Sequence, residues 1–207
     1  MLSSTINLIL LIIFGYLLGS IPFGYLICKA KEIDIRRIGS GATGGTNVSR
    51  ALGIKFGLLV GILDVVKAII PAYLAIEFLF LDWQIILVAI TPILGHIFPV
   101  WLRFKGGKGV GSTLGVLLVL IGWKGFLVLI LIQILVLVFI RVMSFASMTM
   151  ASFIPLVMYA FTHSLSFYLF GIALVVLIWW THRENLQRIR KGVEPKFKFK
   201  KLIRKTS

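Results

Sequence analysis

Residues 104–113 read FKGGKGVGST and lie between two apolar stretches, LVAITPILGHIFPVWL (87–102) and LGVLLVLIG (114–122). Apolar stretches that approach about 20 residues are typical of membrane-spanning helices. The glycines between them let the backbone approach an anion closely, and the two lysines supply positive charge. A Walker loop is excluded, because its lysine precedes a serine or threonine, whereas both lysines here precede a glycine. The sequence therefore predicts a phosphate-binding loop that joins two apolar helices.

The composition also predicts an integral membrane protein. Of the 207 residues, 59% are hydrophobic and 14% are charged, whereas about a quarter of the residues in a soluble domain are charged. The mean hydropathy is +1.03. A net charge of +15 could suit nucleic acid, but that function needs a basic face on a soluble module, and none is visible. We predict an all-α membrane protein without a nucleic acid partner.

Metal and disulfide chemistry have little support in the sequence. The single cysteine, Cys28, excludes an intramolecular disulfide and a cysteine-rich metal site. The histidines, His96, His163 and His182, are far apart and lack the spacing of a helical metal site. We therefore predict no metal and no cofactor.

Seven apolar segments are candidates for transmembrane helices. The fourth is too short to cross a bilayer unaided, so it could be a tilted or partly re-entrant helix inside the bundle. The prediction is a bundle of seven helices with one short fourth helix. The segments run approximately over residues 6–28, 56–79, 83–102, 110–122, 126–140, 145–161 and 165–181.

The distribution of basic residues predicts the orientation of the bundle. With the N-terminus outside, all but two of the 22 basic residues fall on the inner side, the exceptions being Lys67 and Lys124. Such asymmetry is the positive-inside pattern. It places the C-terminus in the cytoplasm. We expect residues 1–192 to form one membrane domain and residues 193–207 to form a basic tail suited to anionic lipid headgroups.

The first inner loop, IDIRRIGSGATGGTNVSRALG (33–53), alternates glycines with hydroxyl and amide side chains. Glycines allow several backbone amides to point into one concavity, and an arginine can complete an anion site. The alternative is a flexible connector, which has no need of the adjoining arginine. The candidate ligands are Ser40, Gly41, Thr46, Asn47 and Arg50.

The second inner loop is the glycine-lysine stretch, placed by this topology on the same side as the first. Its lysines could be ordinary positive-inside anchors. Their position at the start of a helix, whose amides and dipole attract anions, favours phosphate binding. The candidates are Lys105, Gly106, Gly107, Lys108 and Gly109.

The third polar stretch, THRENLQRIRKG (181–192), follows the last apolar segment. His182 and Asn185 are three residues apart and can share one helix face, with Glu184 between them. The alternative is an interfacial helix cap with a solvated charge run. Arg141 and Ser144 mark the inner turn between the fifth and sixth segments.

Two ionisable residues lie inside the second apolar segment. Asp64 and Lys67 are three residues apart and can form an ion pair on one helical face. Such a pair suggests a function or a structural salt bridge equally well. We expect His96, near the inner end of the third segment, to be buried and hydrogen-bonded rather than catalytic.

The motifs together resemble one enzyme family. GSGATGGTNVSR in the first loop, GHIFPVWLRFKGGKGV around the second, and HREN followed by RIRKGVE after the last segment are similar to the acyl-phosphate-dependent glycerol-3-phosphate acyltransferases of bacterial membranes. The resemblance covers almost the whole chain. Ala42 departs from the family pattern, which usually has asparagine at this position.

The resemblance implies transfer of a fatty acyl group from acyl phosphate to the 1-hydroxyl of glycerol 3-phosphate, the first acylation of phospholipid synthesis. It implies lysophosphatidate and phosphate as products, membrane lipids as surroundings, and coupling to an enzyme that makes acyl phosphate. It also implies a bacterial plasma membrane location with the active site on the cytoplasmic face. The residues predicted to be catalytic are His182, Asn185, Ser144 and Lys105; those predicted to be supporting are Asp64, Lys67, His96, Arg141 and Glu184.

Two other classes fit parts of the sequence. An organic-anion transporter would also need a basic, glycine-rich site, but it predicts polar groups spread through the bilayer. A lipid-binding scaffold would explain the basic tail, but it leaves the glycine loops unexplained.

Overall fold

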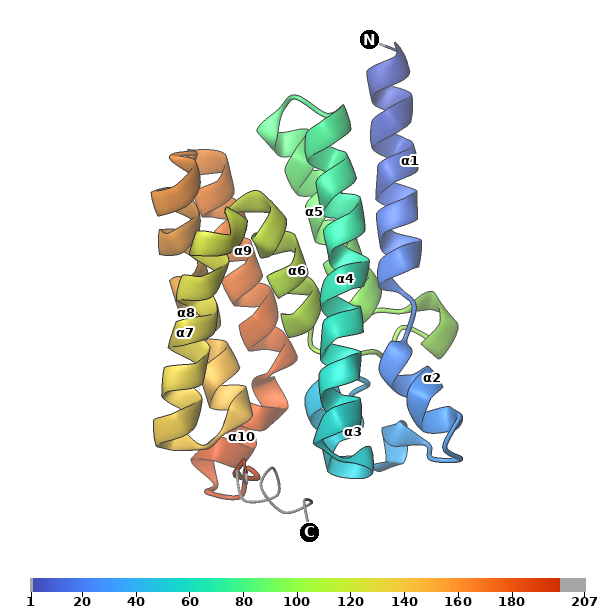
Figure 1. The fold of residues 1–207 in the computed structure, drawn as a ribbon, viewed down its shortest axis with the longest axis vertical. Coiled ribbons are helices and arrows are strands. Elements are labelled where there is room, and N and C mark those ends of the chain that lie inside the picture. Colours follow the sequence, from blue (N-terminus) through green and yellow to red (C-terminus); the bar gives the residue numbers. More distant parts are fainter. Residues whose placement is uncertain (1, 198–207) are drawn as a thin grey trace. The chain divides into compact units, whose positions relative to one another are not determined.

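The computed structural model describes residues 2–197, and every regular element within them is a helix (Figure 1). The all-α prediction is confirmed. The last ten residues of the predicted basic tail, 198–207, lie outside the described residues. The helices are α1 (Leu2–Gly19), α2 (Phe23–Lys29), η1 (Ile35–Arg37), α3 (Gly45–Leu52), α4 (Ile54–Phe78), α5 (Asp82–Ile97), η2 (Val100–Leu102), α6 (Val110–Leu120), α7 (Gly122–Ile140), α8 (Met143–Thr162), α9 (Leu165–Thr181) and α10 (Arg183–Arg190).

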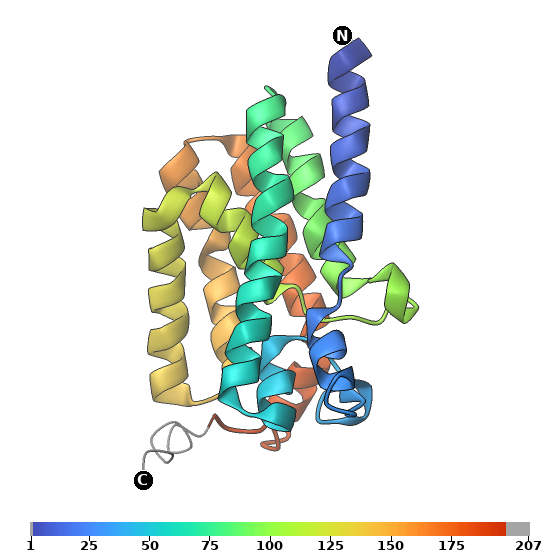
Figure 2. The ribbon, with the colours of Figure 1, turned by 45° about the vertical axis from the view of Figure 1, so that its right-hand side comes forward.

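The chain divides into two compact units, Met1–Trp123 and Lys124–Ser207. In the first unit, α4 is central and packs against α1, α3, α5 and α6. Figures 1 and 2 show α1, α4 and α5 side by side, with α2 and α3 at the end away from the N-terminus. In the second unit, α8 packs along α9, and α10 follows α9. The division into a domain of residues 1–192 and a tail stays a prediction.

The sequence predicts one transmembrane helix over residues 6–28, but the structure divides this segment into two helices. Helix α1 ends at Gly19, and α2 begins at Phe23. Pro22 precedes α2 and cannot donate a backbone hydrogen bond to a continuing helix. At the break, the carbonyl of Ile21 accepts from Phe23 N–H at 3.2 Å and from Lys67 Nζ at 2.9 Å.

The other apolar segments match helices within a few residues, but their lengths differ. Five candidate spans are long and apolar enough to cross a membrane, and the pair α9 and α10, bent by 59°, could provide a sixth. Helix α6 has 11 residues and is about 16 Å long, roughly half the hydrocarbon core. The count of seven spans and the positions of the termini stay predictions.

Large apolar side chains cover much of the exposed helix surface. On α7, Leu131 is 57% exposed and Phe139 is 80% exposed, whereas the buried residues of that helix are Gly125 and Leu129. Such extensive apolar exposure is unfavourable in water but matches a lipid environment. The chain is an all-α integral membrane protein.

Candidate functional site

Asn47, in the first turn of α3, holds the first glycine loop together. Its Nδ2 donates to the carbonyls of Ile38 at 2.8 Å and Ala42 at 3.0 Å. Its Oδ1 accepts from the backbone N–H of Ser40 at 3.3 Å. The side chain is only 2% exposed. The structure therefore shows Asn47 shaping the loop from inside, while its predicted contact with substrate stays a prediction.

Several amides of the first loop already have partners within the protein. Ser40 N–H binds Asn47, and Gly41 N–H donates to Ile38 O at 3.0 Å. The remaining donors include the first-turn amides of α3, at Gly45 and Thr46, because the first amides of a helix have no partner within it. Any anion site here is therefore built from the start of α3 more than from the turn at Ser40 and Gly41.

The side chain of Arg50 lies beside this loop. A Cβ added at Gly39 would lie 3.7 Å from Arg50 Cδ, so the arginine stem borders the glycine directly. Arg50 is in the last turn of α3 and is exposed. The loop is thus accompanied by an accessible guanidinium, as the sequence predicts for an anion site.

The second glycine loop folds back along the end of α5. Gly106 N–H donates to Ile97 O at 3.1 Å, and Gly107 N–H donates to His96 O at 3.0 Å. Just before it, Arg103 and Phe104 have φ values of 52° and 61°, a left-handed conformation that is uncommon outside glycine. Residues in this conformation are held by the surrounding structure and tend to cluster at functional sites.

The end of the second loop has the geometry that the sequence predicts. Gly109 immediately precedes α6 and has a φ of 84°, which favours glycine. Lys105 is exposed and Lys108 is half-buried. The loop therefore leads two lysines and flexible backbone into the start of a helix, where amides and the dipole attract an anion.

The two glycine loops meet in the first unit. Thr43 N–H, from the first loop, donates to Gly106 O of the second at 3.5 Å, and Thr43 is buried. Sequence analysis predicts only that both loops lie on one side of the membrane. The structure adds that they are in direct contact, which brings two glycine-rich, basic segments to one place.

Beneath the second loop lies a buried cluster of charged and polar side chains. Lys67 Nζ is 2.9 Å from Asp64 Oδ1, which confirms the predicted ion pair. His96 Nδ1 is 3.1 Å from Lys67 Nζ and 3.3 Å from Asp64 Oδ1. His96 is 6% exposed, as expected for a buried, hydrogen-bonded histidine.

A second polar network lies in the second unit, where α8, α10 and the segment after α10 bring together residues far apart in sequence. Glu194 Oε1 accepts from Ser144 Oγ at 2.9 Å and from Asn185 Nδ2 at 2.6 Å. Glu194 Oε2 accepts from Arg188 Nε at 2.7 Å. The fold thus places Ser144 next to Asn185, and a buried carboxylate orients both.

His182 lies at the bend between α9 and α10, so it does not share a regular helix face with Asn185, contrary to the sequence prediction. Both side chains are nevertheless buried. His182 Nδ1 is 2.8 Å from the Ile178 carbonyl, which can only accept. In the neutral ring, Nδ1 therefore carries the proton and the basic lone pair is on Nε2.

Glu194 is the important residue that sequence analysis missed. The available signal was its place in RIRKGVE, within the last motif. Glu184, which was predicted to be a supporting residue, has a 66% exposed side chain and an ion pair with Arg188 at 4.0 Å. Arg141 is exposed with a φ of 60°, and its carbonyl accepts from Phe197 N–H at 2.6 Å.

We expect Glu194→Gln to destabilise this network in a pH-dependent way. Burial raises the pKa of Glu194. The hydrogen bonds from Arg188, Asn185 and Ser144 together lower it by more than burial raises it, so the pKa is below its usual value. The carboxylate therefore contributes stability above an unfolded pKa of about 4.3. That contribution disappears as the pH falls through the lower folded pKa.

The measurement is the thermal midpoint of both proteins in detergent across the acidic range. The difference between wild type and Glu194→Gln should be largest near neutral pH and should shrink at acidic pH. A difference that stays constant down to the lowest pH would show that the carboxylate charge contributes nothing. Glu184→Gln, which changes an exposed carboxylate on the same segment, is the matched control.

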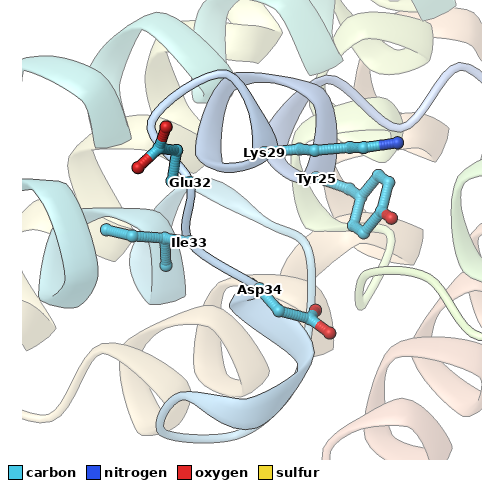
Figure 3. A pocket seen from close by; sticks show the side chains of 5 residues that line it. All are labelled: Tyr25, Lys29, Glu32, Ile33 and Asp34. Carbon is cyan, nitrogen blue, oxygen red and sulfur yellow. The ribbon is translucent and has the colours of Figure 1, made fainter.

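A surface pocket of about 280 Å³ lies in the first unit and contains none of the predicted site residues (Figure 3). Tyr25, Lys29, Glu32, Ile33 and Asp34 line it. A hydrogen bond from Arg36 is the main reason that the pKa of Asp34 falls to about 2. Because two carboxylates accompany its single lysine, this pocket suits an anionic substrate less well than the glycine loops do.

The comparisons with known proteins agree with this architecture. Residues 9–192 match the family model for glycerol-3-phosphate acyltransferase. A glycerol-3-phosphate acyltransferase of Prochlorococcus marinus (strain NATL1A) is 40% identical, covering 91% of this chain and 97% of the relative. That of Aquifex aeolicus (strain VF5) is 39% identical, covering 90% and 97%.

Two solved structures share the fold. The crystal structure of PlsY (YgiH), an integral membrane glycerol 3-phosphate acyltransferase, in its glycerol 3-phosphate form has a TM-score of 0.90 at 37% identity. The match covers 96% of this chain and 99% of that one. Its lysophosphatidic acid form has a TM-score of 0.85 at 38% identity, covering 92% and 95%.

The helical membrane fold, its two glycine loops and these matches define an integral membrane acyltransferase. The chain belongs to the glycerol-3-phosphate acyltransferase family.

Proposed function

We propose that this enzyme transfers a fatty acyl group from an acyl phosphate to the 1-hydroxyl of glycerol 3-phosphate, giving lysophosphatidate and inorganic phosphate. The observation that carries the proposal is the contact between the two glycine loops at Thr43 and Gly106. Both loops lead into helices, and each has an exposed cation, Arg50 or Lys105. The acyl acceptor and the acyl donor each carry a phosphate, so the reaction requires two such anion sites in close proximity.

The chemistry is a single acyl transfer. The 1-hydroxyl oxygen attacks the carbonyl carbon of the acyl phosphate and forms the new ester bond. The bond between that carbon and the bridging phosphate oxygen breaks, and phosphate leaves with its electron pair. The hydroxyl proton passes to a base. Since phosphate is a good leaving group, positioning and charge stabilisation suffice without a covalent enzyme intermediate.

We assign phosphate binding to the first unit. The start of α3 with Arg50 holds one phosphate, and Lys105 with Lys108 and the glycines of the second loop holds the other. The assignment works in either order, because both sites use the same donors. Backbone amides and cations oriented before the reaction stabilise charge on the leaving phosphate at little reorganisation cost.

We assign positioning of the reacting groups to Ser144 and Asn185, with two candidates for the base. His182 offers a neutral Nε2 lone pair, because Nδ1 donates to Ile178. The other candidate is a phosphate oxygen of the substrate, which titrates near neutral pH and lies close to the hydroxyl. The pH profile of a His182→Gln variant distinguishes them: loss of the acidic limb, where activity falls because the base becomes protonated, supports His182, and its retention supports the phosphate.

The proposed setting is the bacterial plasma membrane, with the active site on the cytoplasmic face. The positive-inside pattern supports this orientation, because the glycine loops and the last polar stretch carry most of the basic residues. An acyl phosphate is a reactive mixed anhydride, so an enzyme that makes acyl phosphate has to supply it to this acyltransferase.

The direct test uses purified protein in detergent or lipid with glycerol 3-phosphate and either palmitoyl phosphate or palmitoyl-CoA. We expect phosphate release and lysophosphatidate formation with palmitoyl phosphate alone. Product from palmitoyl-CoA alone would refute the proposed donor. Absence of product from either donor, with folded protein, would refute the reaction and would make solute flux across proteoliposomes the next measurement.

Arg50→Ala and Lys105→Ala are each expected to raise the KM for one phosphorylated substrate. Loss of one charged hydrogen bond costs about 1.5–3 kcal/mol, which corresponds to about 10-fold to 100-fold in KM. The two variants should affect different substrates if each cation serves a different phosphate. Lys31→Ala, which removes an exposed inner cation outside both loops, is the control. Wild-type kinetics in both variants would contradict the site assignment.

A further inference from the structure

The ammonium group of Lys67 is fully occupied by acceptors inside the first unit. It has three N–H donors and three neighbours at hydrogen-bonding distance: Ile21 O at 2.9 Å, Asp64 Oδ1 at 2.9 Å and His96 Nδ1 at 3.1 Å. Lys67 is 2% exposed. A cation with this set of partners is not a substrate ligand, so its function has to be exerted through its neighbours.

The contact with Lys67 determines the protonation of the His96 ring. Nδ1 of His96 lies 3.1 Å from Lys67 Nζ, which can only donate, and 3.3 Å from Asp64 Oδ1, which can only accept when ionised; we assign Nδ1 as an acceptor on the shorter of these contacts. The proton of the neutral ring then lies on Nε2. Asp64 Oδ1 stays close to the same ring nitrogen, at 3.3 Å, because both atoms accept from one ammonium.

The other edge of the His96 ring supports the second glycine loop. A Cβ at Gly107 would overlap His96 Nε2, so ring and loop are packed in direct contact at this point. The backbone of His96 also accepts the Gly107 N–H at 3.0 Å. The position of the ring therefore determines where Gly107, and with it the neighbouring lysines, can lie.

We propose that Asp64, Lys67 and His96 are positioning residues for the anion-binding loop: Lys67 donates to His96 Nδ1, and the ring so oriented supports Gly107. Lys67 also binds Ile21 at the break between α1 and α2, so this support links α4, α5 and that break. A salt bridge with a purely structural role would need only Asp64 and Lys67. The inference rests on the proposed function, in which this loop binds a substrate phosphate.

Two double variants separate positioning from simple charge pairing. Removing Lys67 alone leaves a buried carboxylate without its partner, which is strongly destabilising. Asp64→Asn with Lys67→Met removes both charges but retains an amide N–H that can donate to His96 Nδ1. Asp64→Leu with Lys67→Met removes both charges and the donor, with a side chain of similar shape. The two variants therefore differ mainly in the hydrogen bond to the ring.

We expect both double variants to fold, with similar thermal midpoints in detergent. The variant with leucine should have a KM for one phosphorylated substrate at least 10-fold above that of the variant with asparagine, with kcat within about threefold. Equal kinetic constants in the two variants, at any level, would overturn the proposal, because the donor to His96 would then have no effect.

A measurement independent of activity covers the case in which the proposed reaction is wrong. The chain has three histidines, so ¹⁵N NMR of histidine-labelled protein can be assigned with a His96→Gln variant. We expect the Nε2–H tautomer in wild type and a changed ring signal in the leucine variant. The opposite tautomer, or a ring signal that is the same in all three proteins, would refute the role of Lys67. Inactive wild-type protein would refute the proposed function alone.

Discussion

Gly107→Ala is expected to lower kcat/KM by about 100-fold or more, because a small displacement of groups that position a substrate can cost this much. The added methyl group would occupy the space of His96 Nε2, and the ring cannot retreat, since Lys67 and Asp64 hold its other edge. The loop must therefore move, and its lysines move with it. Steady-state kinetics of the variant in detergent give the effect.

The clash can be tested by removing the His96 ring, against which the added methyl group would lie. Gly107→Ala combined with His96→Ala should have a higher kcat/KM than Gly107→Ala alone, because the space of the ring becomes available to the methyl group. Such non-additivity is expected only for residues in contact. Gly61→Ala, where an added Cβ meets no atom within 4 Å, is the control and should be neutral. Additive losses in the double variant would contradict the contact.

Asn47→Ala is expected to abolish activity and to destabilise the protein. The change removes the donor to the carbonyls of Ile38 and Ala42 and the acceptor for Ser40 N–H. Each buried polar group that loses its partner costs about 1–3 kcal/mol. The first glycine loop then loses its side-chain support, and the glycine that borders the Arg50 stem is no longer held in place. Thermal midpoint and kcat/KM, measured on the same preparation, test both parts.

Two substitutions define the cause of this effect. Asn47→Asp keeps the acceptor for Ser40 but loses the donors, and it brings a carboxylate against two carbonyls, so it should be as damaging as alanine. Ser49→Ala removes one hydrogen bond to Thr46 O on the exposed side of the same helix and should have little effect. A stable, active Asn47→Ala protein would show that the loop keeps its shape without the amide.

Two kinds of residue show why the sequence predicts some of the site and not the rest. The positions of Lys105, Lys108 and the adjoining glycines at the start of α6 are local properties, because composition and helix boundaries depend on neighbouring residues. Sequence spacing likewise predicts the ion pair of Asp64 and Lys67, since residues three apart share a helix face. The structure confirms both arrangements.

The role of Glu194 could not be predicted in the same way, because its donors come from residues 6, 9 and 50 positions away. Sequence proximity instead suggested Glu184, which is exposed. The internal use of Asn47 was equally hidden, because an amide beside glycines fits a ligand and a loop brace alike. Whether Asn47 binds a ligand or supports the loop depends on where the surrounding carbonyls point.

By itself, the sequence determined that this is a helical membrane protein with basic, glycine-rich loops, because apolar length, charge asymmetry and backbone freedom are properties of short segments. Only the tertiary structure decided that the first segment breaks before Phe23, that the two glycine loops touch, and that His96 lies against Gly107. The physical reason is that hydrogen bonds and close packing between distant segments depend on directions in space, which the order of residues alone does not specify.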